Sequence, residues 1–118
     1  MTTTEVANKL VDLCRQGKIE EAQETLYAEN VQSIEASEMM GPKVVSGLDA
    51  IKAKAVAFQA GVEEFHGATI SDPIVAGNSF AFTWIMDATF KGRGRMSIEE
   101  ICVYQVNSGK VILEQFFY

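Results

Sequence analysis

The sequence predicts an α+β fold, in which three N-terminal helices pack on one face of a strongly curved sheet of mixed or antiparallel strands. Apolar residues recur at helical spacing through much of the first sixty residues, whereas the last forty form three segments rich in β-branched and aromatic residues. Glycine turns at 91–94 and 107–109 join these segments. Such short joints allow only antiparallel neighbours, because a parallel return needs a crossover of about a dozen residues.

The three helices are predicted in the N-terminal half. The first begins after a threonine cap among residues 2–4 and runs to about Gln16. The second covers about Lys18–Ala28, and the third opens near Asp49 and runs to about Ala60. The apolar stripes that these helices are expected to bury are Val6, Leu10, Leu13 and Cys14 in the first, Ile19, Ala22, Leu26 and Tyr27 in the second, and Ile51, Ala55, Val56 and Phe58 in the third.

The remaining segments are predicted as strands and loops. Val31–Ala36 is expected to form a short strand, and Met39–Pro42 a loop, because proline cannot donate to a ladder. A further β-type stretch, Val62–Val75, is interrupted at Asp72-Pro73. The three strands of the C-terminal meander are expected over Ser79–Phe90, Met96–Val106 and Lys110–Tyr118.

Length and composition favour one globular domain over residues 1–118, because 47% of the residues are hydrophobic. A formal charge of −6 argues against nucleic acid or an anionic membrane as partner. No apolar run approaches the roughly 20 residues of a membrane span, and the N-terminus lacks the pattern of a signal peptide, so a cytoplasmic location is expected. Cys14 and Cys102 form no paired motif and are expected to be buried thiols.

Three short segments, in this order of elements, carry a family resemblance. They are Leu26–Val31 at the end of the second helix, Ser46–Ile51 at the start of the third, and Asn107–Ile112 near the C-terminus. Over nearly its whole length the sequence resembles the NTF2-like superfamily, which includes SnoaL-like and ketosteroid-isomerase-like domains. The resemblance implies a cone-shaped α+β fold. It leaves the function open, because this superfamily holds isomerases, cyclases, dehydratases and non-catalytic binders.

A cone of sheet that helices close should contain a mostly apolar pocket with a few polar groups. Because side chains alternate along a strand, residues that share the inner face are candidates for the pocket wall. Trp84 has the alternative role of a core anchor. The predicted ligand-binding residues are Trp84, Phe82, Tyr104, Glu114, Phe116 and Tyr118.

The register of the last hairpin decides which glutamate faces the pocket. A three-residue loop over 107–109 places Glu100 and Glu114 on one face, whereas a two-residue turn places Glu99 there with Glu114. We favour the first, because it puts Gly109 at the position that needs a positive φ. In that register Val106 pairs with Lys110, Glu100 with Phe116, and Cys102 with Glu114.

Glu100 is then a candidate proton carrier. A carboxyl group among apolar neighbours is costly to ionise, so its pKa should rise and it should be able to donate a proton near neutral pH. A second glutamate in the same cavity should strengthen this effect. The alternative is that Glu99, Glu100 and Glu114 face solvent or pair with Arg93 and Arg95.

The similarity to the steroid isomerases implies further roles. Their general base lies eight residues beyond a tyrosine that corresponds to Tyr27, which is the position of Glu35, and their protonated second acid falls closest to Glu100. The tyrosine of their oxyanion hole aligns near Val11, which cannot donate, and its supporting tyrosine aligns near Ala55. Ketosteroid isomerase activity itself is therefore not expected.

His66 is the only histidine. A lone histidine without partners at ligand spacing does not predict a metal site, and the sequence suggests no cofactor. His66 is expected either to be hydrogen-bonded in the core or rim, or to serve as a third acid or base, because its ordinary pKa lies near neutrality. The predicted catalytic residues are Glu35, His66 and Glu100.

Two functions follow from these patterns. The first is a SnoaL-like protein that binds a small apolar molecule and acts as a cofactor-independent isomerase, cyclase or dehydratase. The alternative is a non-catalytic module for ligand binding or dimerisation. A homodimer through the sheet is expected, because the chosen register leaves an apolar outer face. That face comprises Ile101, Val103, Leu113 and Phe117.

Overall fold

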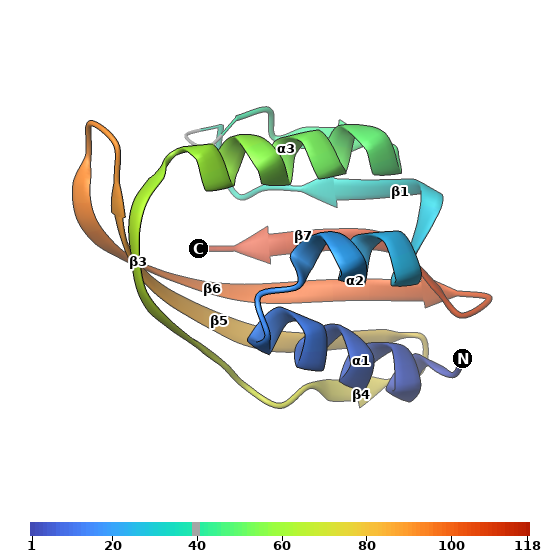
Figure 1. Ribbon diagram of the computed structural model, residues 1–118. Helices are drawn as coiled ribbons and strands as arrows, with labels where there is room; N and C mark the ends of the chain where they lie inside the picture. Colours follow the sequence, from blue (N-terminus) through green and yellow to red (C-terminus); the bar gives the residue numbers. More distant parts are fainter. Residues whose placement is uncertain (39–40) are drawn as a thin grey trace.

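A computed structural model describes residues 1–38 and 41–118. Three helices cover one face of a strongly curved seven-stranded sheet, which is the predicted α+β cone (Figure 1). The predicted loop at Met39-Met40 lies outside the described residues. The helices are α1 (Thr3–Arg15), α2 (Ile19–Leu26) and α3 (Leu48–Ala60), and the strands are β1 (Tyr27–Ile34), β2 (Val44–Ser46), β3 (Val62–Ile70), β4 (Ile74–Ala76), β5 (Ser79–Phe90), β6 (Gly94–Asn107) and β7 (Lys110–Phe117).

The strand order is β2-β1-β7-β6-β5-β3, and β4 pairs with the N-terminal end of β5. All neighbours are antiparallel except β1 and β7, which are parallel. This parallel pair joins the N-terminal and C-terminal parts of the chain within one sheet. It therefore brings the segment after α2 beside the C-terminus, where the two can share one site (Figure 1).

Helix α1 begins where the threonines predicted it. Thr2 accepts a hydrogen bond from the backbone N–H of Glu5, and the Glu5 carboxylate accepts one from the backbone N–H of Thr2, which forms a capping box. The helix buries its apolar stripe against the sheet. Within the described part of the chain, no helix is long and apolar enough to cross a membrane.

The junction of α2 and β1 differs from the sequence prediction. The second helix ends at Leu26, and Tyr27 begins an eight-residue strand instead of closing the helical stripe. Tyr27 pairs with Val111 of β7. Strand formation depends on the neighbours that the tertiary structure supplies, so this pairing overrides the local helical pattern. The short strand β2 was not predicted.

The predicted register of the last hairpin is wrong by two residues. The turn contains only Ser108 and Gly109, which both have positive φ, of 52° and 75°. A β-bulge at Ile112 then adds one residue to β7, so that the direct partners are Tyr104 with Glu114 and Cys102 with Phe116. A two-residue turn alone would place Glu114 on the outer face of the sheet. The extra residue Ile112 returns Glu114 to the inner face.

The core lies between the helices and the concave face of the sheet. Phe80 and Phe82 both stack on Tyr104, with ring centroids 4.9 and 5.4 Å apart. Cys14 and Cys102 are buried free thiols, as predicted. Two members of this core, Cys14 and Tyr104, also line a cavity.

Candidate functional site

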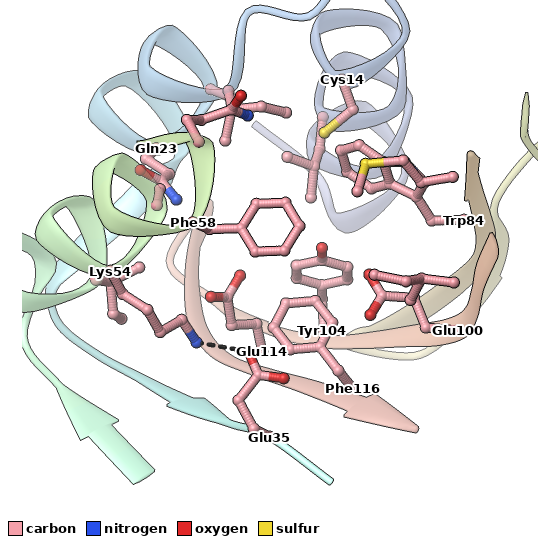
Figure 2. A pocket seen from close by; sticks show the side chains of 18 of the residues that line it. Cys14, Gln23, Glu35, Lys54, Phe58, Trp84, Glu100, Tyr104, Glu114 and Phe116 are labelled. Atoms are coloured by element: carbon pink, nitrogen blue, oxygen red, sulfur yellow. Dashed lines mark hydrogen bonds and ion pairs between the residues drawn. The ribbon is translucent and has the colours of Figure 1, made fainter. Parts of the chain in front are cut away.

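A cavity of about 210 Å³ lies between the three helices and the concave face of the sheet (Figure 2). Its volume exceeds the roughly 150 Å³ of a cavity that admits benzene and is below the roughly 300 Å³ at which drug-sized pockets begin. It therefore suits a compound of one or two rings. Most lining side chains are apolar or aromatic, and its charged side chains are Glu35, Lys54, Glu100 and Glu114.

A hydrogen-bonded network forms the polar floor of this cavity. Lys54 on α3 donates to Oε1 of Glu35 and to Oγ of Ser33, both at 2.8 Å. The Tyr118 hydroxyl donates to Oε2 of Glu35 at 3.1 Å. Lys54 also lies 5.5 Å from the centre of the Phe116 ring, within cation–π range. Glu35 is thus the partner of Lys54 in an ion pair.

Glu114 is the most deeply buried carboxyl group of the site. Burial raises its pKa, and hydrogen bonds from Tyr27 and Ser33 offset part of the rise. The Tyr27 hydroxyl donates to Oε2 of Glu114. Because Ser33 also accepts from Lys54, this network extends from Tyr118 at the rim to Tyr27 in the core.

Glu100 lies on β6 on the other side of the cavity floor (Figure 2). Burial raises its pKa to about 7, and the charges of Glu35 and Glu114 add to the rise. The thiol of Cys102 donates to Oε1 at 3.6 Å, and this bond together with the charge of Lys54 opposes it. Glu100 has no ion-pair partner among the described residues. Its carboxyl group can therefore hold or release a proton near neutrality.

Two polar atoms of the cavity lining lack hydrogen-bond partners within residues 1–38 and 41–118. They are Oε1 of Gln23 on α2 and Nε1 of Trp84 on β5, and both are buried. Trp84 is the direct cross-strand partner of Glu100. Native proteins leave few such atoms unpaired, so each calls for an explanation.

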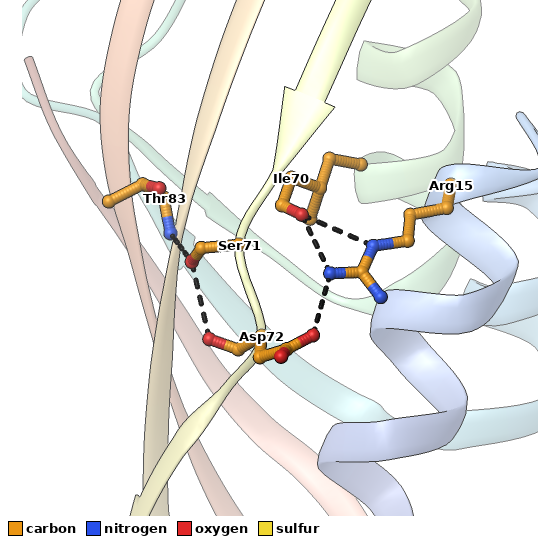
Figure 3. A network of polar contacts seen from close by, with 5 residues as sticks. All are labelled: Arg15, Ile70, Ser71, Asp72 and Thr83. Carbon is orange, nitrogen blue, oxygen red and sulfur yellow. Dashed lines mark hydrogen bonds and ion pairs between the residues drawn. The ribbon is translucent and has the colours of Figure 1, made fainter.

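A second cavity of about 710 Å³ adjoins the first and shares Trp84, Met86 and Phe58 with it. Arg15 and Ile70 line this second cavity. Arg15 donates two hydrogen bonds to the carbonyl oxygen of Ile70, at 2.8 and 3.1 Å, and one to the carboxylate of Asp72 at 2.9 Å (Figure 3). These contacts tie the end of α1 to the break between β3 and β4.

The structure brings most of the predicted site residues together. Phe82 is an exception, because it packs in the core against Tyr104 and does not line the cavity. His66 is also outside: it is the extra residue of a β-bulge on β3, is exposed, and has Nε2 2.7 Å from Oγ1 of Thr89. The predicted residues that do line the cavity are Glu35, Trp84, Glu100, Tyr104, Glu114, Phe116 and Tyr118.

Sequence reasoning missed four polar residues of the lining. Tyr27 was assigned to a helix, whereas Gln23, Lys54 and Gln59 were not considered. A signal existed for Lys54 and Gln23, because Lys54 lies three residues after the buried Ile51 and Gln23 lies four residues after Ile19, on the stripes that their helices bury. No group of three or more His, Cys, Asp or Glu side chains in the described ranges is arranged to hold a metal ion.

The model of the SnoaL-like domain family matches residues 1–118. The chain belongs to the SnoaL-like family. A protein from Mesorhizobium loti, described as a SnoaL-like polyketide cyclase and, in brackets, as a carbohydrate phosphatase, is 35% identical to this SnoaL-like domain, with 100% of both chains covered and a TM-score of 0.93. Comparison with curated proteins gives no match.

More distant structures share the fold of this SnoaL-like domain. An NTF2-like protein from Burkholderia pseudomallei is 12% identical, with a TM-score of 0.79 over 100% of this chain and 92% of that one. A protein from Catenulispora acidiphila with a ketosteroid-isomerase-like fold, in complex with trimethylamine, is 15% identical, with a TM-score of 0.69 over 100% of this chain and 87% of that one.

Proposed function

We propose that the protein binds a small, largely apolar carbonyl compound in the 210 Å³ cavity and moves a proton on it without a cofactor, in an isomerisation, cyclisation or dehydration. One observation carries this proposal: two carboxyl groups in different electrostatic environments line the same cavity. Glu35 is ion-paired with Lys54, whereas Glu100 has a pKa of about 7. Pairs of this kind divide the roles of base and acid.

In this mechanism Glu35 accepts a proton from the carbon next to the ligand carbonyl, while protonated Glu100 donates to the carbonyl oxygen. The products of the step are an enol, a protonated Glu35 and an ionised Glu100. The enol can then be reprotonated at another carbon, or attack a second carbonyl to close a ring. General acid and base groups each contribute about 10²–10⁴-fold to such steps. The description of the Mesorhizobium loti relative as a polyketide cyclase favours the second course.

Exchange of the proton next to the carbonyl tests this proposal directly. Small cyclic ketones and lactones would be incubated with the protein in D₂O, and loss of the proton signal followed by NMR. We expect exchange above the buffer rate for at least one compound, and a decrease of about 10²-fold in Glu100→Gln. Glu99→Gln, which changes an exposed neighbour on the opposite face of β6, is the matched control.

A non-catalytic binding module is the second candidate. It is favoured by the closed network of Lys54, Glu35, Ser33, Glu114 and Tyr27, whose members already satisfy one another. The same experiment separates the two functions. Ligand binding without exchange supports the module, whereas exchange that Glu100→Gln abolishes supports the enzyme.

We also propose that two copies associate through the outer face of the sheet. Ile101 and Phe117 are neighbours across β6 and β7 and remain 50% and 48% exposed, and Ile85 adds to the same face. Contiguous apolar surface of this kind is typical of an interface. Light scattering at micromolar concentration should give a dimer, and Ile101→Glu should give a monomer. Val56→Glu, at an exposed position on α3, should leave the dimer intact.

A further inference from the structure

Gln23 occupies a position in α2 where the helical pattern calls for an apolar residue. It lies four residues after Ile19 and three before Leu26, on the face that the helix buries. Its side chain is only 6% exposed, although glutamine is rarely found fully buried. The neighbouring Glu20 and Glu24 face solvent, as the amphipathic pattern requires.

The Gln23 amide contributes little to holding the fold together. Its Oε1 is buried without a hydrogen-bond partner in the part of the chain that the structure describes. Burying a polar group without a partner destabilises the folded state, and methionine would fill the same space without that cost. Stability alone therefore does not account for a glutamine at this position.

The cavity offers an explanation for this amide. Gln23 lines the 210 Å³ cavity from the helical side, and Glu100 lines it from β6, on the opposite side in Figure 2. The space between them is bounded mainly by apolar and aromatic side chains, which include Phe58 and Trp84. A ligand that reaches Glu100 with one polar group would have its other end near an unpaired amide.

We propose that Gln23 is a specificity-determining residue that hydrogen-bonds a hydroxyl group of the ligand, so that the protein selects small hydroxylated carbonyl compounds over their deoxy analogues. This inference rests on the proposed function, because it assigns the carbonyl end of the ligand to Glu100. A hydroxyl both donates and accepts, so it pairs with either end of the amide. A second carbonyl group would pair only with the NH₂ end.

Gln59 provides an internal comparison. It also carries an amide and also lines the cavity, but it is exposed at the C-terminal end of α3, so water can satisfy its polar atoms. A ligand gains less by replacing water at an exposed amide than by pairing one that is buried and unsatisfied. Gln59→Met is therefore the matched control for Gln23→Met.

The test compares two pairs of probes that differ only by a hydroxyl: cyclohexanone with 4-hydroxycyclohexanone, and 2-tetralone with 6-hydroxy-2-tetralone. Dissociation constants would be measured by calorimetry for the wild type and both variants. In at least one pair, we expect the hydroxylated probe to bind the wild type about 5–10-fold more tightly, as one hydrogen bond implies. This preference should disappear in Gln23→Met and persist in Gln59→Met.

Thermal unfolding of the ligand-free variants gives a readout that needs no ligand. Gln23→Met should unfold at the same temperature as the wild type or higher. A decrease of several degrees would mean that the amide is structural and would overturn the inference. Equal binding of both members of each pair to the wild type would also overturn it, while leaving the proposed function standing. Binding of neither member would overturn the proposed function itself, and this inference with it.

Discussion

Nζ of Lys54 lies 2.8 Å from Oε1 of Glu35, and the two side chains are only 18% and 13% exposed. The pair joins α3 to the end of β1 and sets the charge on one side of the cavity. A partly buried ion pair is costly to break on one side only, because the remaining charge loses both its partner and its water.

Lys54→Met should therefore destabilise the protein more than the loss of an exposed ion pair would. We expect a decrease of about 2–4 kcal/mol in the free energy of unfolding, measured by urea denaturation at neutral pH. Adding Glu35→Gln should recover most of this loss, because no unpaired charge is then left. A cost below about 0.5 kcal/mol for Lys54→Met would show that the pair behaves like a surface contact.

The free energy of unfolding of the wild type should decrease as the pH rises from about 4.5 to about 7, because Glu100 loses its proton. Its pKa is about 7 in the folded protein, against an ordinary value of 4.5, so the folded state keeps a proton that the unfolded state releases. Glu100→Gln removes this effect. It should be about as stable as the wild type at pH 4 and about 1–3 kcal/mol more stable at pH 8.

The pH dependence of Glu100→Gln would be measured by denaturation at both pH values, with Glu99→Gln as the control for loss of a surface charge. NMR titration of the glutamate side-chain carboxyl carbons measures the pKa of Glu100 directly. If Glu100 titrates near its ordinary value of 4.5, it is solvated, and the acid assigned to the mechanism is lost.

Tyr27→Phe should destabilise the protein by about 1–3 kcal/mol, because the buried Glu114 carboxyl loses a hydrogen-bond donor. It should also raise the pKa of Glu114 further, since the bond from Tyr27 lowers that pKa. Glu114→Gln should be tolerated better than Tyr27→Phe, because an amide oxygen still accepts from the tyrosine. Equal stability of Tyr27→Phe and the wild type would contradict this account.

Arg15→Met should cost about 1 kcal/mol, mostly through its two hydrogen bonds to the Ile70 carbonyl. Asp72→Asn should cost less than about 0.5 kcal/mol, because Asp72 is 91% exposed and exposed ion pairs contribute little. Hydrogen exchange at residues 70–74 should quicken in Arg15→Met alone. A larger effect of Asp72→Asn would reverse the assigned order of importance.

The sequence by itself determined the helices, the antiparallel meander and the alternation of side chains along β5 and β6. These features follow from local rules, since the apolar period and the glycine turns act within a few residues. They predicted the α+β class and the shared inner face of Glu100 and Tyr104 on β6, with Trp84 beside them on β5. The same parity predicted Phe117 and Ile101 on the outer face, where both are exposed.

Only the tertiary structure decided the pairings between distant segments. Tyr27 became a strand residue because β7, more than eighty positions later, offers it a parallel ladder. Bulges at Ile112 and His66 kept Glu114 inside and turned the histidine out, and no local pattern marks an inserted residue. The contact of Lys54 with Glu35 and the unpaired amide of Gln23 likewise depend on how the helices pack on the sheet, which side-chain periodicity within one element does not specify.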